Sequence, residues 1–277
     1  MLLFSLPTVG LKHPAVQAAR ALHSPAARSD QGRYLIEGEN LLAVALASEV
    51  VMTTAFFAQG AEEQWADLAL ALQAREVPCY RVSRGVLRKI LGTGYETAVA
   101  SAAVVERLAF VEEALFAQPE PLLVVGERLQ DPLNVGVLVR TADAVGATAL
   151  MFTTDGADPF SRRAVRSSTG SILRLPVGFT ADLPGKLRNW QDRGVRVIAT
   201  SAHADTDYWE VDFTGPCAVV VGNETTGLSP AVRDLAQVTV RIPMRGGAHS
   251  LNVAVAAGIV LYERVRQQAS KGRPGGE

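Results

Sequence analysis

Residues that could bind a ligand are concentrated in the stretch Cys217–Glu263. The run Cys217–Val221 predicts a fully buried strand, because its β-branched residues are continuous and Gly222 follows at once. Glu224 and Gly227 then form a G-x-E-x-x-G turn, and a Ser-Pro pair after it predicts the start of a short helix. This pattern places glycine backbone and one carboxylate at the end of a strand.

A second strand, Val238–Ile242, is expected to end in another glycine-rich loop. Small and polar residues crowd that loop at the start of an apolar helix from Leu251 to about Gln267: Gly246, Gly247, Ser250 and Asn252. Both loops would offer free backbone donors and acceptors near one helix N-terminus. Open α/β sheets usually bind their ligands at such a place.

A third polar motif lies upstream, in Asp131-Pro-Leu-Asn134-Val-Gly136. Asn134 could cap a helix that runs to about Val145 and carries Arg140 in its second turn. Taken alone, Arg140 reads as the partner of Asp143 or Glu127. A functional role for Arg140, within N-x-G-x-x-x-R-T-A, is implied by the family resemblance described below.

The elements that would position these motifs alternate along the chain. Apolar runs predict strands at 34–37, 50–57, 79–82, 100–105, 122–125, 149–153, 173–177, 195–200, 217–221 and 238–242. Further helices are expected at 14–23, 41–47, 62–75, 86–91, 111–118 and 183–193. Such strand–helix alternation favours a parallel sheet with helices on both faces.

Three segments together resemble a known family: ERLQDPLNVGVLVRTADAVGA, GNETTGLS and IPMRGGAHSLNVAVAAGIVLYE. They look like the motifs of the SpoU-type (TrmH-like) RNA ribose 2′-O-methyltransferases of the SPOUT superfamily. The resemblance spans Leu123 to about Arg264, in the same order and spacing. It implies an α/β fold with a mostly parallel sheet and a trefoil knot, in which the chain around 217–251 threads itself. Periodicity alone would have predicted an unknotted doubly wound sheet.

The resemblance also implies a cofactor, S-adenosyl-L-methionine, and a set of site residues. The residues expected to be catalytic or to orient the reactants are Arg140, Asn134, Glu224, Ser250 and Asn252. The residues expected to bind the cofactor are Thr200, Ser201, Val221, Gly222, Asn223, Glu224, Gly227, Ile242, Pro243, Met244, Ser250 and Leu251. No metal is expected.

The role of Arg140 has two readings. The family resemblance implies that it acts as a base on the ribose 2′-hydroxyl. A guanidinium has a pKa above about 12 and normally stays protonated, so a bidentate grip on a neighbouring phosphate is equally natural. Glu224 is expected to brace its loop by accepting N–H bonds, with a role as base as the lesser alternative.

The N-terminal third carries a weaker likeness to the family's substrate-binding domain, which is similar to ribosomal protein L30e. A basic residue, Arg28, precedes Tyr34-Leu-Ile-Glu37-Gly38, which matches that domain's F/Y-x-x-E-G strand end. The chain's net charge of −1 argues mildly against nucleic acid, but acid-free basic clusters can still neutralise phosphates. The residues expected to bind RNA are Arg28, Arg81, Arg84, Arg88, Lys89, Arg162, Arg163 and Arg166. Solvated helix faces are the alternative reading of these clusters.

The length of the chain, 277 residues, and the prolines near its middle predict two domains. Pro119 and Pro121 break the chain, so we place an RNA-binding domain at 1–115 and the methyltransferase domain at 116–277, with a disordered tail after about 268. The apolar start is too short for a membrane span and lacks a positive region before it, which suggests a cytoplasmic protein. Cys79 and Cys217 lack metal-ligand spacing and are expected to be buried thiols.

Two other enzyme classes fit poorly. A nicotinamide-binding protein needs G-x-G-x-x-G after its first strand, and Gly92-Thr-Gly94 lacks the third glycine. A serine hydrolase needs a G-x-S-x-G elbow, which the sequence does not contain. The remaining alternative is a non-catalytic RNA-binding protein that keeps the fold.

The expected function is therefore methylation of a ribose 2′-hydroxyl in structured RNA, ribosomal RNA ahead of transfer RNA. The last helix keeps an apolar face of Leu251, Val255, Ile259 and Tyr262. Because the resemblance implies pairing through the catalytic domain, we expect a homodimer.

Overall fold

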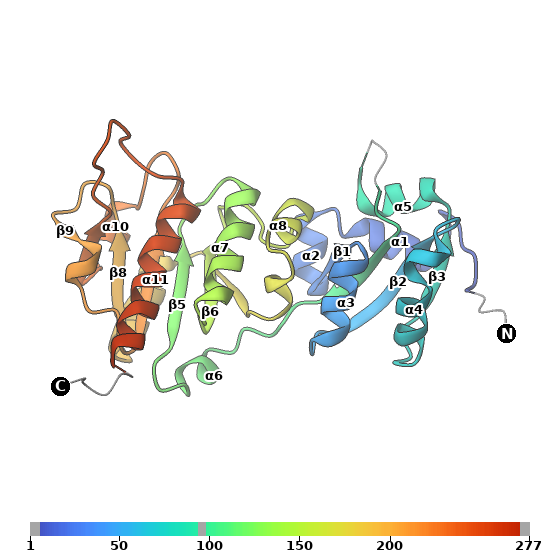
Figure 1. The fold of residues 1–277 in the computed structure, drawn as a ribbon, viewed down its shortest axis with the longest axis horizontal. Coiled ribbons are helices and arrows are strands. Elements are labelled where there is room, and N and C mark those ends of the chain that lie inside the picture. The colour runs from blue at the N-terminus through green and yellow to red at the C-terminus, as the bar shows by residue number, and fades with distance from the viewer. Residues whose placement is uncertain (1–5, 94–97, 272–277) are drawn as a thin grey trace. The chain divides into compact units, whose positions relative to one another are not determined.

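Two compact units make up the chain. The computed structural model describes residues 6–93 and 98–271. The first unit comprises Met1–Leu108 and Phe160–Arg174, and the second comprises Ala109–Pro159 and Leu175–Glu277. The chain therefore enters the second unit, returns to the first for one short segment, and goes back. Figure 1 shows the elements of each unit.

The first unit is built on a four-stranded sheet with strand order β1-β4-β2-β3. β4 is antiparallel to β1 and β2, whereas β2 and β3 are parallel. The strands are β1 (Arg33–Glu37), β2 (Met52–Ala58), β3 (Cys79–Val82) and β4 (Ser101–Glu106). The helices are α1 (Pro14–Ala21), α2 (Pro25–Gln31), α3 (Glu39–Ala47), α4 (Glu62–Gln73) and α5 (Arg84–Leu91).

The sequence analysis missed α2. Its signals were present: Ser24 stands at the N-cap, Pro25 is the first helical residue, and Gly32 ends the helix at φ +61°. Proline suits a first turn, and glycine adopts the left-handed backbone that terminates a helix. The helix has only seven residues and little apolar periodicity, so its pattern was too weak to detect.

The segment Phe160–Arg174 packs on β1. Phe160 lies 4.9 Å from the ring of Tyr34, measured between centroids. Glu37, whose side chain is 5% exposed, pairs with Arg162 at 2.5 Å and with Arg166 at 2.9 Å. Helix α8 (Arg162–Ser167) and the 3-10 turn η1 (Ser171–Leu173) therefore belong to the first unit, although the chain on either side of them belongs to the second.

The chain also divides earlier than the boundary proposed near residue 116. Glu112, in α6 (Glu112–Phe116), accepts hydrogen bonds from Trp190 Nε1 at 2.6 Å and from Lys186 Nζ at 3.0 Å. These bonds attach α6 to α9 (Leu183–Asp192), so residues 109–115 belong with the second unit.

A seven-stranded sheet, all of whose pairings are parallel, forms the second unit. Its order is β7-β6-β5-β10-β8-β11-β9. The strands are β5 (Leu122–Gly126), β6 (Ala149–Thr153), β7 (Val177–Thr180), β8 (Arg196–Thr200), β9 (Thr206–Asp207), β10 (Cys217–Val221) and β11 (Val238–Arg241). This mostly parallel α/β architecture, preceded by a smaller α/β unit, confirms the predicted fold class.

The strand order departs from the common doubly wound sheet. In that sheet the fourth strand along the chain lies beside the first, whereas here β10 comes between β5 and β8. β10 follows β5 and β8 in the sequence but lies between them in the sheet. This order requires an unusual path of the chain. The threading itself stays a prediction from the family resemblance.

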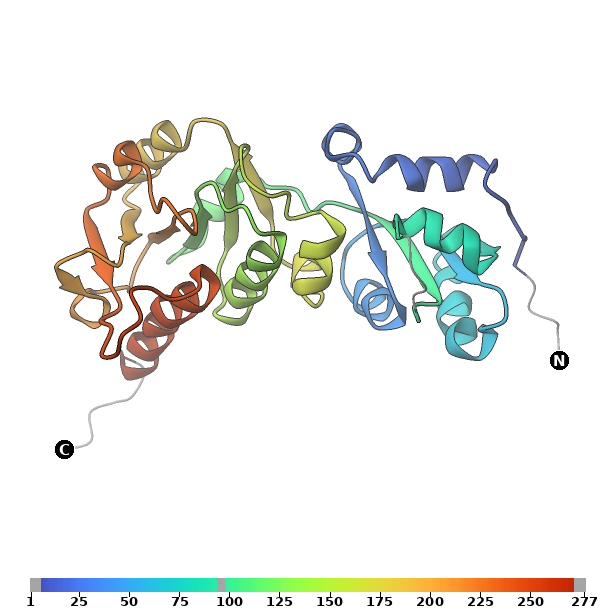
Figure 2. The same ribbon diagram turned by 90° about the horizontal axis from the view of Figure 1, so that it is seen from above.

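Helices cover both faces of this sheet (Figure 2). α7 (Pro132–Ala144) and α11 (Val253–Lys271) pack together on one face, and α9 packs with α10 (Pro230–Arg233) on the other. α7 and α11 approach closely at Gly258, where an added Cβ would lie 3.7 Å from Thr141 Cγ2. Trp190 of α9 and Val220 of β10 are fully buried in the core between the sheet and α9.

Two predicted elements differ from the structure. The strand expected at 173–177 begins only at Val177, because Gly170, at φ +97°, starts a 3-10 turn and Pro176 ends the segment before the sheet. The last helix continues to Lys271, so the prediction of a disordered tail after about 268 is wrong for residues 269–271. Residues 272–277 lie outside the described part of the chain.

Candidate active site

The three predicted motifs meet at one edge of the parallel sheet. Parallel strands place their carboxyl ends on the same edge, which here carries the ends of β5, β8, β10 and β11. The loop after β5 leads into α7, the loop after β10 holds Glu224, and the loop after β11 leads into α11. Segments from residues 127 to 252 are thereby brought together.

Glu224 binds the loop that follows β5. Its Oε2 accepts a hydrogen bond from the Gln130 N–H at 3.1 Å, and its Oε1 accepts one from the Asp131 N–H at 3.2 Å. Oε1 also accepts from Asn134 Nδ2 at 3.0 Å. The sequence predicted that Glu224 braces a loop in this way. The loop it holds belongs to a different motif.

Asn134 passes this connection on to α11. Its Oδ1 accepts a hydrogen bond from Asn252 Nδ2 at 2.8 Å. Asn252 Oδ1 in turn accepts from the N–H groups of Ala254 at 3.0 Å and Val255 at 3.3 Å, in the first turn of α11. We call the chain Glu224–Asn134–Asn252 the amide relay. It links all three motifs through side chains.

The prediction that Asn134 caps α7 is wrong. Asp131 is the N-cap, and its Oδ1 accepts from the Leu133 N–H at 2.9 Å. Pro132 occupies the first helical position, where its fixed φ is favourable, so the helix starts three residues earlier than expected. The Asn134 side chain is thereby left to join the amide relay.

The environment of Glu224 keeps its carboxylate ionised. Partial burial alone would raise the pKa of Glu224, but the hydrogen bonds from Asn134 and from the backbone of the two loops outweigh it and lower the pKa. A carboxylate that is ionised and already holds three donors is poorly suited to remove a proton. The geometry therefore supports bracing over the alternative role as base.

Arg140 and Ser250 stand outside the amide relay. Arg140 is exposed on α7, and its guanidinium has no hydrogen-bond or ion-pair partner in the described part of the chain. The pairing with Asp143 or Glu127, which was the alternative to a functional role, is therefore not formed. Ser250 is exposed and likewise unpaired within residues 6–93 and 98–271. Both side chains remain available for a ligand.

The loop after β10 is folded tightly on itself. Asn223 and Gly227 exchange two backbone hydrogen bonds, at 3.1 and 2.9 Å. A Cβ at Gly222 would lie 2.4 Å from the Gly227 carbonyl carbon and 2.5 Å from the Leu228 nitrogen, so only glycine fits. Gly227 has φ +66°, which also favours glycine. Small residues are required here for backbone reasons.

Comparison with known proteins decides the family. The model of the SpoU rRNA methylase family matches residues 121–262, and that of the MRM3-like substrate binding domain matches residues 13–101. An uncharacterised tRNA/rRNA methyltransferase of Synechocystis sp. is 38% identical over 267 residues, which cover 95% of each chain. The chain belongs to the SpoU rRNA methylase family.

Two relatives connect this family to a defined activity and cofactor. A 23S rRNA (uridine(2479)-2′-O)-methyltransferase of Streptomyces viridochromogenes is 39% identical over 186 residues, 65% of this chain and 64% of the relative. The SpoU methyltransferase AviRb from the same organism, solved with AdoMet, has a TM-score of 0.83 at 33% identity. That alignment covers 95% of this chain and 100% of the other.

A second solved structure supports the same fold. It is an AdoMet-bound rRNA methyltransferase from Sinorhizobium meliloti, with a TM-score of 0.80 and 29% identity. The alignment covers 94% of this chain and 97% of that chain. Both units of the fold are therefore shared with these methyltransferases.

The residues predicted to bind the cofactor have properties that suit S-adenosylmethionine. In residues 243–251, no backbone N–H or C=O group forms a hydrogen bond with another described residue. Ile242, Pro243 and Met244 are half-buried and Leu251 is 38% exposed, which provides apolar surface beside these free groups. An adenosine needs such a combination of apolar walls and backbone partners.

Some proposed cofactor residues already have their side chains engaged. Thr200 Oγ1 donates to the Val220 carbonyl at 3.1 Å, and Ser201 Oγ accepts from the His203 N–H at 3.2 Å. Asn223 Nδ2 donates to the Arg128 carbonyl at 2.8 Å, while Asn223 Oδ1 accepts from the Thr225 and Thr226 N–H groups. Val221 is fully buried. These residues can contact a cofactor mainly through backbone atoms.

Arg28, predicted to contact RNA, is buried in the first unit. It is 6% exposed, and its guanidinium donates to the carbonyls of Leu22 at 2.7 Å and His23 at 2.9 Å. Those carbonyls lie at the end of α1, so Arg28 satisfies helix-terminal acceptors. We remove it from the proposed RNA-binding residues.

The other predicted basic residues lie in two places. On α5, Leu87, Ile90 and Leu91 are buried, while Arg84 and Lys89 are exposed and Arg88 is half-buried. Arg81, on β3, donates from Nε to Thr8 Oγ1 at 3.0 Å. On α8, Arg162 and Arg166 bind Glu37, whereas Arg163 is exposed. Only part of the predicted basic set is therefore free to meet phosphates.

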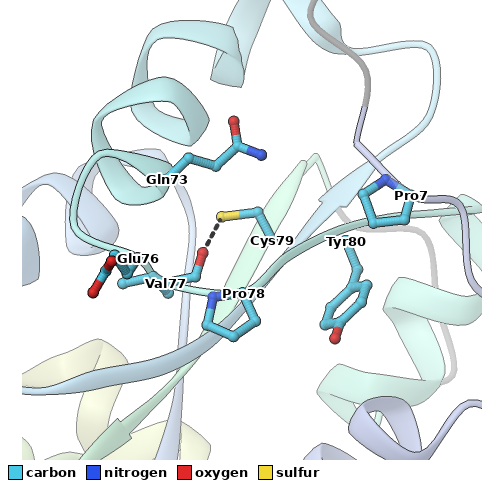
Figure 3. A pocket seen from close by; sticks show the side chains of 7 residues that line it. All are labelled: Pro7, Gln73, Glu76, Val77, Pro78, Cys79 and Tyr80. Atoms are coloured by element: carbon cyan, nitrogen blue, oxygen red, sulfur yellow. Dashed lines mark hydrogen bonds between the residues drawn. The ribbon is translucent and has the colours of Figure 1, made fainter.

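The first unit contains a shallow pocket of about 340 Å³, formed by residues far from these motifs in the sequence. Figure 3 shows Cys79 beside Val77 within it, with the Sγ donating to the Val77 carbonyl at 3.3 Å. Burial raises the pKa of the Cys79 thiol to about 11, so it stays protonated and unreactive. Cys79 and Cys217 are both buried free thiols, as predicted. We assign the pocket no chemical role.

Two kinds of feature are absent from residues 6–93 and 98–271. Within these ranges, no cluster of three His, Cys, Asp or Glu side chains could hold a metal ion. The same ranges contain no helix with both the length and the apolar character needed to span a bilayer.

The sequence analysis overlooked two residues that shape the SpoU site. Glu127 accepts from the Ser229 N–H at 2.8 Å, and Thr153 Oγ1 accepts from the Arg128 N–H at 2.8 Å. A signal for Glu127 was available, because a carboxylate directly after a continuous apolar strand is expected at the ligand-binding edge of the sheet. We found no comparable signal for Thr153.

Proposed function

We propose that this protein transfers the methyl group of S-adenosylmethionine to a ribose 2′-hydroxyl of ribosomal RNA. The amide relay carries this proposal, because it joins the three loops of the site and leaves Arg140 exposed beside them. The 2′-O-methylating relative and the AdoMet-bound neighbours support the same chemistry.

The cofactor supplies both the methyl group and its leaving group, so the protein mainly provides geometry. The amide relay would fix the loop before α7 and the start of α11, between which the ribose is positioned. Ser250 is exposed and unpaired among the described residues, and we propose that it hydrogen-bonds the ribose or its phosphate. Transfer would break the bond between the sulfonium sulfur and the methyl carbon and release the 2′-hydroxyl proton to solvent, so no step requires Glu224 to exchange a proton.

Arg140 is proposed to hold the phosphate next to the reacting ribose. Its guanidinium stays protonated at neutral pH and can grip a phosphate in bidentate fashion. Because it has no partner among the described residues, it need not break an existing ion pair to bind RNA. We favour this clamp over the role as base.

RNA binding is proposed to involve the basic face of α5 and the exposed Arg163 of α8. Arg84 and Lys89 are exposed on α5, and Arg88 is half-buried. These groups would contact the phosphate backbone and contribute affinity that falls with salt. Ribosomal RNA is the proposed substrate class, because two of the similar proteins are rRNA methyltransferases. The cytoplasm is the proposed compartment.

A homodimer is proposed to form through α7 and α11. Leu133 and Val137 are 44% and 40% exposed and share a face of α7 with Arg140. Val255 and Tyr262, each 52% exposed, lie one helix away on α11. Exposed apolar residues gathered on two packed helices mark an interaction surface, and a second copy could cover it by two-fold symmetry. Arg140 would then lie at the interface.

The proposal is tested with the full-length protein, labelled S-adenosylmethionine, and ribosomal RNA or transfer RNA as acceptor. We expect label in ribosomal RNA. Arg140→Ala should lower kcat by on the order of 10²-fold or more, because a group that acts on the transition state is lost. Cofactor affinity and melting temperature should stay near those of the unmodified protein.

Arg188→Ala provides the matched control, because Arg188 is an exposed arginine on α9, across the sheet from α7. It should leave turnover unchanged. Normal turnover of Arg140→Ala would contradict the role of Arg140. RNA binding without any methyl transfer or cofactor binding by the unmodified protein would favour the non-catalytic alternative.

A further inference from the structure

Glu127 is a buried carboxylate directly after β5 that belongs neither to the amide relay nor to the proposed cofactor-binding residues. It is 5% exposed. Its Oε2 accepts from the Ser229 N–H at 2.8 Å, and its own N–H donates to the Val221 carbonyl at 2.9 Å. Burying a carboxylate is costly unless it is well hydrogen-bonded. The hydrogen bond from the Ser229 N–H therefore offsets part of this cost.

Ser229 closes the loop that follows β10. It is the N-cap of α10, and its Oγ accepts from the Val232 N–H at 3.4 Å. At the other end of the loop, Gly222 lies against the backbone of Gly227 and Leu228. Glu127 thus fixes the far end of a loop whose near end is already packed tightly.

The two loops hold each other by reciprocal bonds. Glu127, in the loop after β5, binds the end of the loop after β10. Glu224, in the loop after β10, binds the N–H groups of Gln130 and Asp131 in the loop after β5. Asn223 adds a bond to the Arg128 carbonyl. Arg128 has φ +53°, a strained conformation for a non-glycine residue that these surroundings must maintain.

We propose that Glu127 is a positioning residue for S-adenosylmethionine binding. By holding the Ser229 N–H, it keeps the backbone of 221–227 in the conformation that meets the cofactor. This inference rests on the proposed function, since the cofactor is the ligand that the loop presents its backbone to. The role is indirect, because Glu127 acts through Ser229 and need not touch the cofactor.

The test measures cofactor affinity of full-length variants by isothermal titration with S-adenosylmethionine. Glu127→Ala should weaken binding by about tenfold or more, as expected when a hydrogen bond from a charged group that shapes the loop is lost. Glu127→Gln keeps an oxygen that can accept from Ser229 and should stay within about threefold of the unmodified protein. Glu263→Ala is the control for burial, because Glu263 is 6% exposed and binds Arg266 and Gln267 within α11. It should lower the melting temperature and leave cofactor affinity unchanged.

A second pair of variants removes the donor instead of the acceptor. Ser229 has φ −63°, which a proline can adopt, so Ser229→Pro deletes the N–H with little change of backbone. Ser229→Ala keeps the N–H and removes only the hydroxyl cap. We expect Ser229→Pro to weaken cofactor binding as Glu127→Ala does, and Ser229→Ala to bind nearly normally. The two harmful changes combined should cost little more than either alone.

Normal cofactor affinity of Glu127→Ala, with a melting temperature lowered as in Glu263→Ala, would overturn this inference and leave the proposed function standing. Equal affinities of Ser229→Pro and Ser229→Ala would overturn it as well, even if Glu127→Ala does not fold. Absence of S-adenosylmethionine binding by the unmodified protein would instead contradict the proposed function.

Discussion

Glu224 acts in this site as an ionised acceptor, and its hydrogen bonds give the strongest residue-level evidence for how the motifs combine. One carboxylate receives the N–H groups of Gln130 and Asp131 and the amide of Asn134. The Oδ1 atom of Asn134 accepts a hydrogen bond from Nδ2 of Asn252. Each of the three side chains comes from a different motif, so a change at any one should affect the others.

The pH dependence of stability should reveal this acceptor. The pKa of Glu224 is lower in the folded protein than its ordinary value of 4.5, because hydrogen bonds to the ionised form outweigh burial. The stabilisation it contributes is therefore fully present above pH 4.5 and is lost as the pH falls through the lowered pKa. Glu224→Gln should unfold at lower urea than the unmodified protein near pH 7, and the gap should narrow below pH 4.5.

Glu263→Gln is not a suitable control for this measurement, because the pKa of Glu263 is lowered as well. Glu113→Gln is suitable, since no hydrogen bond to the Glu113 side chain is formed within the described residues. Its urea midpoint should follow that of the unmodified protein at every pH. A gap for Glu224→Gln that stays constant through acidic pH would contradict the assigned role.

Individual residues were the least predictable level of this protein. The sequence motifs identified Asn134, Glu224 and Asn252, but not which atoms pair, because pairing depends on how the strands are ordered. Asn134 was expected to cap α7, a role that belongs to Asp131. Arg28 is a basic residue of the kind that contacts RNA, yet it is buried against the end of α1. Local sequence cannot distinguish an exposed arginine from one that satisfies carbonyls.

At the scale of elements, the loop after β10 should tolerate no side chain at its first residue. Gly222→Ala would place a Cβ 2.4 Å from the Gly227 backbone, which cannot move as a flexible side chain would. We expect a loss of about 1–3 kcal/mol in the free energy of unfolding, as for other overpacked sites, together with weaker S-adenosylmethionine binding. Chemical denaturation and cofactor titration measure the two effects.

Gly246→Ala is the matched control, because a Cβ at Gly246 would meet nothing within 4 Å. Its free energy of unfolding should stay close to that of the unmodified protein. A Gly222→Ala protein as stable as Gly246→Ala would show that the tight turn is not required.

Elements were more predictable than residues. Continuous β-branched runs identified β5 and β10, and strand–helix alternation identified the parallel sheet. The insertion of β10 between β5 and β8 could not be derived from periodicity, which carries no information on strand order. The seven-residue α2 and the two-residue β9 were missed because short elements offer too few positions for a pattern.

At the scale of the whole molecule, the proposed homodimer should depend on the apolar faces of α7 and α11. Val137→Glu and Val255→Glu would each place a charge within the proposed interface, where burying it without a partner is costly. We expect the unmodified protein to sediment with twice the mass of one chain and both variants to sediment as single chains. Turnover on RNA should fall with the loss of the dimer if Arg140 serves a site at the interface.

Leu70→Glu is the control for this surface, because Leu70 is 49% exposed on α4 of the first unit. It should leave the mass in solution unchanged. An unmodified protein that sediments as a single chain at micromolar concentration would contradict the proposed dimer.

The path of the chain between the two units was also beyond the reach of sequence. In the sequence, residues 160–174 fall between β6 and β7, two strands of the methyltransferase sheet. Their arginines suggested RNA binding. The structure shows that Glu37, far away in the sequence, binds two of those arginines. Long-range ion pairs of this kind depend on tertiary structure, and no local pattern announces them.

The position of the methyl group on the RNA tests the central claim most directly. A 2′-O-methyl group removes the nucleophile that alkali needs to cleave the adjacent phosphodiester, whereas a methyl group on a base leaves that hydroxyl free. Ribosomal RNA labelled by the protein from methyl-tritiated S-adenosylmethionine would be hydrolysed completely in alkali and separated by charge. We predict that the label survives in dinucleotides that resist alkali. Label recovered only in mononucleotides would contradict ribose methylation.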